Sequence, residues 1–178
     1  MSQDDLIARA QTGDNDAIEA LLLSCEKKVY NIAYRYMGNE ADAYDMAQES
    51  LIKIYKKLRS YRSEASFSSW AYRLCVNTCL DEIRRRKNRP VLLDQVQKDA
   101  DNNAVSPEAY ALALEDRENL QKAINMLAEE QKSVIILRDI SGFSYEEVAE
   151  CLGLSIGTVK SRIFRGRQKL RKIISAQV

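Results

Sequence analysis

The chain contains no histidine, and its four cysteines include no Cys-x-x-Cys pair. Protein zinc sites are built mainly from histidine and closely spaced cysteine side chains. The cysteines lie in apolar helical patterns, and only Cys75 and Cys79 share a helix face by spacing; the others are Cys25 and Cys151. We therefore expect four small buried hydrophobic side chains, and neither a metal site nor another cofactor.

Long apolar segments are also missing. No run approaches the roughly 18 apolar residues that indicate a membrane-spanning helix. The N-terminus carries Asp4 and Asp5, so it lacks the basic start of a secretory signal peptide. We expect a cytoplasmic protein that does not insert directly into a membrane.

The net charge of the 178-residue chain is only +1, but it is unevenly distributed. Residues 1–90 have 15 basic and 13 acidic side chains, residues 91–130 have 3 and 9, and residues 131–178 have 9 and 4. The net charges of these three segments are therefore +2, −6 and +5. The length allows one compact domain or two small ones, and an acidic middle separates two more basic ends.

Residues 144–178 contain the strongest local pattern. Ser144 and Glu147 form a capping box at a helix start, Gly153 suits the left-handed turn that ends a helix, and Ser155 suits the next N-cap. This order predicts a helix-turn-helix.

The second helix of this motif is basic. Val159, Ile163 and Leu170 give it one apolar stripe, and no acid occurs between Ile156 and Val178. Such a helix suits the major groove of DNA. The alternative is that this basic face is only solvated. Solvated helix faces, however, normally mix positive and negative side chains. The basic residues are Lys160, Arg162, Arg165, Arg167, Lys169, Arg171 and Lys172.

Helical spacing also dominates the N-terminal half. One pattern runs from Val29 to Met37 and stops at Gly38-Asn39. The next helix begins near Asn39 or Ala41, and its expected core face comprises Ala47, Leu51, Ile54, Tyr55 and Leu58. Its other side is acidic, with Asp42, Asp45, Gln48, Glu49 and Ile52, and on its own this pattern favours a solvated surface.

A polar loop at residues 61–69 leads into a third long helix that runs to about Lys87. Trp70, Arg73 and Asn77 lie on one broad polar side of this helix. Aromatic faces and guanidinium groups stack on unpaired bases, so this side is a candidate base-binding platform. The alternative is that Trp70 belongs to the core. The helix ends in a basic cluster, residues 84–89, that suits phosphate contact.

Residues 90–107 show no helical or strand periodicity of apolar residues and are rich in Asp and Asn. We therefore expect a mobile acidic linker. Helical spacing returns with Leu112, Leu120, Ile124 and Leu127. We therefore predict an all-α protein of two small helical domains, at residues 1–90 and 111–178, joined by a flexible linker at residues 91–110.

Three segments together resemble the extracytoplasmic-function sigma factors of bacterial RNA polymerase: DAYDMAQESLIKIYKKL at 42–58, SFSSWAYRLCVNTCLDEIRRRK at 66–87, and SYEEVAECLGLSIGTVKSRIFRGRQKLRK at 144–172. The helix-turn-helix alone would be less specific. The resemblance implies a promoter-specificity factor that is not an enzyme. It also implies that core RNA polymerase, promoter DNA and an anti-sigma factor, often linked to the membrane, are its partners.

By this resemblance, residues 1–90 correspond to sigma region two. The motif that docks on the clamp helices of core polymerase is matched by Asp45, Gln48 and Glu49. This match replaces the interpretation of the acidic face as a merely solvated surface. The loop and third helix match the part that captures flipped bases of the minus-ten element and opens the duplex. The residues expected to contact this DNA are Tyr61, Arg62, Phe67, Trp70, Arg73, Asn77, Arg84 and Arg85.

Residues 111–178 correspond to sigma region four, which reads the minus-thirty-five element and contacts the polymerase flap. Phe164 could instead be core, because it neighbours Ile163. The family often has Leu-Pro where this chain has Leu127-Ala128, which leaves that helix boundary open. The residues expected to contact DNA are Arg138, Ser155, Thr158, Lys160, Ser161, Phe164 and Arg165.

Two other classes fit less well. A free-standing dimeric helix-turn-helix regulator would not need the match over residues 42–87. A recombinase or nuclease would need a nucleophile or metal cluster, whereas Asp42, Asp45 and Glu49 lie on a helix face without a set of partner ligands.

Overall fold

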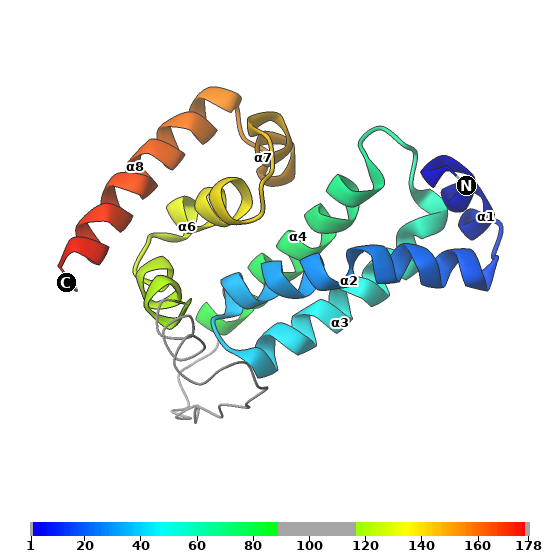
Figure 1. The fold of residues 1–178 in the computed structure, drawn as a ribbon, viewed down its shortest axis with the longest axis horizontal. Coiled ribbons are helices and arrows are strands. Elements are labelled where there is room, and N and C mark those ends of the chain that lie inside the picture. Colours follow the sequence, from blue (N-terminus) through cyan, green and yellow to red (C-terminus); the bar gives the residue numbers. More distant parts are fainter. Residues whose placement is uncertain (1, 89–116, 177–178) are drawn as a thin grey trace, which may run out of the picture.

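A computed structural model describes residues 2–88 and 117–176, and every regular element in these two ranges is helical (Figure 1). The linker predicted at residues 91–110 lies outside the described ranges. The N-terminal half contains α1 (Gln3–Gln11), α2 (Asn15–Met37), α3 (Glu40–Lys57), the short 3-10 helix η1 (Leu58–Ser60) and α4 (Phe67–Lys87). The C-terminal half contains a helical stretch at 117–125, then α6 (Glu129–Ile135), the π-helical η2 (Ile136–Ile140), α7 (Tyr145–Leu152) and α8 (Ile156–Ser175).

Short-range signals set the helix boundaries of the N-terminal half. Gly38 ends α2 with a φ of 83°, a left-handed conformation that glycine adopts without strain. The Asn39 side chain then accepts a hydrogen bond of 2.9 Å from the backbone N–H of Asp42 and caps α3. Both boundaries, and the end of α4 at Lys87, were predicted from the sequence and are confirmed.

The core of this half lies where α2 packs along α3 and α4. Val29, Ile32, Ile54 and Val76 are fully buried there. The predicted core face of α3 is wrong at one position: Tyr55 is 54% exposed. Ile54 already points inward, and successive helical residues differ by about 100°, so its neighbour turns toward solvent.

The C-terminal half packs α8 across α6. Gly166 permits the close approach, because a Cβ at this position would lie 2.9 Å from Cγ1 of Ile135. The boundary left open near Leu127 is a real helix end: Ala128 is extended, with φ −62° and ψ 145°, and α6 begins at Glu129. That φ is one that proline could also adopt.

The two halves are packed together, with the C-terminal half on the α4 side of the N-terminal half and α1 at the far end (Figure 1). The buried side chain of Gln121 donates to the carbonyl of Arg35 (3.2 Å), and Lys132 donates to the carbonyl of Tyr36 (3.0 Å). The Tyr72 and Phe143 rings meet edge to face at 5.6 Å. All four cysteines are buried, as predicted, and Cys151 joins the same hydrophobic cluster as Cys25, Cys75 and Cys79.

Candidate nucleic-acid interface

The helix-turn-helix has the predicted local geometry. The Ser144 hydroxyl accepts from the Glu147 N–H (3.1 Å), and the Glu147 carboxylate accepts from the Ser144 N–H (2.8 Å). The bond from the Ser144 N–H and one from the Ser69 hydroxyl hold the pKa of the Glu147 carboxyl below its usual range. Gly153 has φ 65° in the turn, and Ser155 caps α8 through the Thr158 N–H at 3.1 Å. Both helix ends are thus fixed by contacts within four residues.

The outward face of α8 presents the expected contact residues. Lys160, Ser161 and Arg165 are exposed. Phe164 is 63% exposed, so it is not a core residue, whereas its neighbour Ile163 is buried. This face could lie in a groove of DNA with an aromatic ring and cations directed at base edges.

The basic residues of α8 divide into two sets. Arg167 forms two hydrogen bonds to Asp139 of η2 (2.9 and 2.5 Å), and Arg162 pairs with Glu130 of α6 (3.3 Å). These two arginines brace α8 against the preceding helices. The outward set is Lys160, Arg165, Lys169, Arg171 and Lys172, all of which are exposed.

Three further residues that are predicted to contact DNA lie beside the helices of the helix-turn-helix. The Ser155 hydroxyl is 2.8 Å from that of Thr158. Arg138 donates to the Phe143 carbonyl (2.7 Å), and its guanidinium lies 4.7 Å from the Tyr145 ring centroid. Arg138 therefore holds the turn before α7, and its expected phosphate contact stays a prediction.

The loop before α4 is organised by three aromatic rings. Trp70 lies 5.1 Å from Tyr61 and 5.7 Å from Phe67, measured between ring centroids. The Tyr61 hydroxyl donates to the Ala65 carbonyl at 2.6 Å, which closes the loop. Tyr61 and Phe67 are buried and Trp70 is half-buried. In this conformation the two buried rings support the indole, and a base contact by either of them would need the loop to move.

The remaining predicted residues of the loop and of the first turns of α4 differ in accessibility. Arg62 and Asn77 are exposed. Arg73 is half-buried and forms an ion pair with Glu150 of α7. The neighbouring Ser69 hydroxyl donates to Glu147 at 2.7 Å. These contacts with α7 were not predicted, because the partners lie 77 and 78 residues apart in the sequence.

The basic cluster at the end of α4 is balanced by acids. Arg84 pairs with Asp81 (3.3 Å) and Arg85 with Glu82 (2.6 Å). Arg86 donates to both oxygens of Asp42 on α3, at 2.6 and 2.8 Å. The Arg86 guanidinium lowers the pKa of Asp42 to about 2. Arg84 and Arg85 are exposed and accessible to phosphate, whereas Arg86 joins α4 to α3.

The acidic face of α3 is accessible. Asp45 and Glu49 are exposed, Gln48 is half-buried, and the apolar side chain of Ile52 is 50% exposed. Glu49 pairs with Lys53 one turn later at 2.7 Å. A surface with acids around one apolar residue could receive a basic partner helix.

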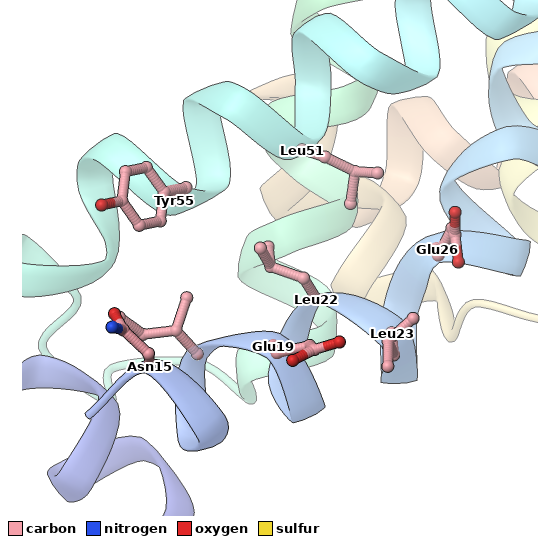
Figure 2. A pocket seen from close by; sticks show the side chains of 8 residues that line it. Asn15, Glu19, Leu22, Leu23, Glu26, Leu51 and Tyr55 are labelled. Atoms are coloured by element: carbon pink, nitrogen blue, oxygen red, sulfur yellow. The ribbon is translucent and has the colours of Figure 1, made fainter. Parts of the chain in front are cut away.

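A hollow of about 270 Å³ lies beside this face, between α2 and α3. Figure 2 shows Leu51 of α3 and Leu22 of α2 directed toward one another across it, with Glu19 and Glu26 along α2 and Tyr55 at one end. Sequence reasoning missed this hollow, because its walls come from two helices and only α3 matched a known motif. Ile18 and Leu22 of α2 were the available signal, because residues four positions apart lie on the same face of a helix.

Comparison with known proteins gives two family matches in order along the chain. Residues 21–89 match the model of sigma-70 region 2, and residues 117–170 match that of sigma-70 region 4. The chain is 36% identical over 177 residues to the ECF RNA polymerase sigma-E factor of Haemophilus influenzae, covering 95% of this chain and 93% of the relative. It is 32% identical over 177 residues to the RNA polymerase sigma-H factor of Pseudomonas aeruginosa, covering 95% and 92%.

A solved structure from the same comparison is similar over most of the chain. It is the sigma factor RpoE of Bartonella quintana, determined in complex with the anti-sigma factor NepR. The TM-score is 0.70 at 26% sequence identity, covering 88% of this chain and 96% of the other. No helix in residues 2–88 or 117–176 is both long and apolar enough to cross a membrane.

Proposed function

The chain belongs to the extracytoplasmic-function sigma factors of bacterial RNA polymerase, and we propose that its two halves divide the work of promoter recognition. Like its relatives, it is a transcription initiation factor rather than an enzyme: it binds core polymerase, recognises promoter DNA and promotes its opening. Residues 1–90 engage the polymerase and the minus-ten element, and residues 111–178 engage the minus-thirty-five element. The observation that supports this division most directly is the order of the two family matches, with the helix-turn-helix in the second.

The polymerase contact is assigned to α3. Asp45, Gln48 and Glu49 offer acidic and amide groups to a basic clamp helix, and exposed Ile52 offers an apolar contact among them. The adjacent hollow between α2 and α3 enlarges this surface, because Leu51 and Tyr55 follow Gln48 on the same helix. Apolar area in the centre and acids around it are the features of a specific protein interface.

Strand capture is assigned to the loop and helix α4. Trp70 supplies a half-exposed indole held by Tyr61 and Phe67, while Arg73 and Asn77 supply polar groups along the next two turns. Stacking on an aromatic ring contributes about 1–3 kcal/mol per base, comparable with the few kcal/mol that unstacking costs. Arg62, Arg84 and Arg85 add exposed cations for the phosphates.

Upstream recognition is assigned to α8. Lys160, Ser161, Phe164 and Arg165 form the base-reading surface, while Ser155, Thr158 and Arg138 fix the first turn and the preceding loop near the DNA backbone. Arg162 and Arg167 have structural roles, because their charges are already paired with Glu130 and Asp139.

Control by an anti-sigma factor is the final part of the proposal. The Bartonella quintana relative was determined with such a partner bound. We assign this chain to the cytoplasm, where an anti-sigma factor anchored in the membrane could hold it until a signal releases it.

Transcription reconstituted with core polymerase tests the assignment. Core polymerase plus this chain should initiate from a specific subset of a randomised promoter library, with preferred sequence at two separated elements. The alternative of a free-standing dimeric regulator predicts a dimer that binds its sites tightly without polymerase. Tight DNA binding by the chain alone, with no initiation in the reconstituted reaction, would replace the proposal by that alternative.

A further inference from the structure

A second hollow, of about 330 Å³, lies at the end of the N-terminal half that is remote from the C-terminal half. Its walls come from α1, from the turn between α1 and α2, and from the end of α3 with η1, which lie together at that end of the molecule (Figure 1). Its lining is mainly polar, whereas the hollow beside the acidic face is apolar. The residues that line it include Ala10, Gly13, Asn15, Lys56, Leu58 and Arg59.

The cations of this hollow are Lys56 and Arg59, and both are exposed. Within residues 2–88 and 117–176, the side chain of neither forms an ion pair or a hydrogen bond. Asp14, in the adjoining turn, is already engaged: it pairs with Arg9 at 2.6 Å and caps α2 through the Ala17 N–H at 3.1 Å. Two cations without a counter-ion beside a polar hollow favour an anionic ligand. Elsewhere in this half, the arginines that are paired with acids are Arg9, Arg73, Arg84, Arg85 and Arg86.

Gln11 of α1 joins this hollow to the loop assigned to strand capture. Its side-chain amide donates to the carbonyl of Leu58 at 3.2 Å and to the carbonyl of Tyr61 at 2.8 Å. Arg59 lies two residues before Tyr61, and the exposed Arg62 follows it. The cations of the hollow are therefore held in a fixed position next to the loop, and a nucleic-acid strand that leaves the loop on this side meets them.

The position of the linker indicates which part of the strand that is. The C-terminal half, which is assigned to the upstream element, is joined to the C-terminal end of α4 after Lys87. Upstream DNA therefore lies toward this end of α4, where Arg84 and Arg85 are exposed. The loop and the hollow lie at the N-terminal end of α4, so the strand passes them on its way downstream.

We propose that Lys56 and Arg59 bind phosphates of the non-template single strand immediately downstream of the minus-ten element, and that the hollow receives part of its backbone. The proposal rests on the assignment of the loop and α4 to strand capture. The match to sigma-70 region 2 begins at residue 21, so α1 and the turn that form one wall lie outside it. Lys56 in the last turn of α3 also complements the helix dipole, but this accounts neither for Arg59 nor for the hollow.

The test uses holoenzyme assembled from core polymerase and the full chain with Lys56→Gln and Arg59→Gln. Both positions are exposed, so the fold should be unaffected. The probes are fluorescent non-template oligonucleotides. The short one ends at the downstream edge of the minus-ten element recovered by promoter selection, and the other two extend it by the same length at the 3′ end or at the 5′ end. The control, Lys27→Gln with Lys122→Gln, removes the same charge from two exposed positions that line neither hollow.

The variant should bind the 3′-extended oligonucleotide about fivefold more weakly than the parent does, which is the scale of two solvent-exposed charge contacts. The slope of log affinity against log salt should fall in magnitude by about 1.4, because each phosphate contact to a single strand contributes about 0.7. Binding of the short and the 5′-extended oligonucleotides should be unchanged. Scrambling the 3′ extension should have no effect, since phosphate contacts carry no sequence information. The control variant should match the parent throughout.

Equal binding of the 3′-extended oligonucleotide by variant and parent would overturn the site, while sequence-dependent binding of the short one would leave the proposed function standing. An equal loss on all three oligonucleotides would indicate general electrostatic attraction and would also overturn it. Inorganic phosphate is a further probe. If it raises the melting temperature of the parent but not of the variant, and the oligonucleotides do not distinguish the two, the hollow binds a small free anion instead. If the parent holoenzyme binds the short oligonucleotide no better than a scrambled one, the assignment to strand capture itself fails.

Discussion

Gly166 of α8 lies against Ile135 of α6 so closely that a Cβ on the glycine would be 2.9 Å from Cγ1 and 3.2 Å from Cδ1 of the isoleucine. Ile135 is 1% exposed and sits in the interior of the C-terminal half, so it has little room to withdraw. The position of α8, the proposed recognition helix, therefore depends on a residue outside the set that is proposed to contact DNA.

Gly166→Ala should lower the stability of the C-terminal half. Alanine is better than glycine in a helix by about 1 kcal/mol, but forcing a methyl group into a packed core costs about 1–3 kcal/mol, so we expect a net loss of up to about 2 kcal/mol. Urea unfolding followed by circular dichroism measures it. Gly157→Ala is the control: its Cβ would lie 4.0 Å from the Ser155 hydroxyl, and we expect a gain of about 0.5 kcal/mol. A stabilised Gly166→Ala protein would show that the helices separate without cost.

The Asp42–Arg86 ion pair should contribute a stability that depends on pH. Asp42 has its pKa lowered to about 2 in the folded chain, so the contribution is present above about pH 4 and is lost as the pH falls toward 2. A double-mutant cycle with Asp42→Asn and Arg86→Gln should give a coupling of about 1 kcal/mol at pH 7 and about half of that at pH 3. Equal coupling at both pH values would contradict a charge-dependent contact.

Reversing charge on the acidic face of α3 should abolish polymerase binding. Asp45→Arg with Glu49→Arg places cations against a basic clamp, which can cost several kcal/mol at an interface. Both positions are exposed, and losing the Glu49–Lys53 pair should cost only a few tenths of a kcal/mol, so the melting temperature should change little. Gel filtration with core polymerase measures binding. The control is Glu118→Arg with Glu146→Arg, which makes the same charge change elsewhere. Unaltered binding of the α3 variant would mean that this face is only solvated surface.

Asn77→Ala should leave polymerase binding intact and impair promoter opening. The exposed amide is expected to bind an unpaired base, so the defect should be partly rescued when the minus-ten region is already single-stranded. Permanganate reactivity of promoter thymines measures opening. Asn88→Ala, at the exposed end of the same helix, is the control. Normal thymine reactivity with Asn77→Ala would remove this residue from the strand-capture surface.

Arg165→Ala and Arg171→Ala should have different effects on upstream DNA. Loss of a base contact by Arg165 should cost about 1–3 kcal/mol and relax the preference at one position, whereas loss of a phosphate contact by Arg171 should weaken all sequences alike. Binding to matched and scrambled minus-thirty-five elements distinguishes the two. Equal losses on both elements for Arg165→Ala would argue against base reading.

Features fixed by neighbouring residues were predictable from the sequence. The Ser144–Glu147 capping box, the left-handed Gly38 and Gly153, and the start of α8 after Ser155 each depend on contacts within a few positions. The helical character of each half, and the placement of the helix-turn-helix, follow from these local signals and from apolar spacing.

Features that depend on packing were not predictable in this way. All seven basic residues of α8 look alike in a pattern, yet Arg162 and Arg167 are paired with acids of the preceding helices, and only the fold distinguishes them. Phe164 and Tyr55 illustrate the same limit, since a helical wheel cannot decide the boundary of a buried face to within one residue. The contacts of Glu147 and Glu150 with α4 lie beyond any local rule, because they join residues 77 and 78 positions apart.

The contacts Ser69–Glu147 and Arg73–Glu150 each take one partner from each half of the chain. Sigma factors with altered promoter choice could be engineered by exchanging region four between relatives, as if the halves were independent modules. In this chain such an exchange would replace Glu147 and Glu150 along with the recognition helix. A hybrid would therefore inherit new upstream specificity together with altered packing between its two halves, because Ser69 and Arg73 would lose their acidic partners wherever the incoming region lacks acids at these positions.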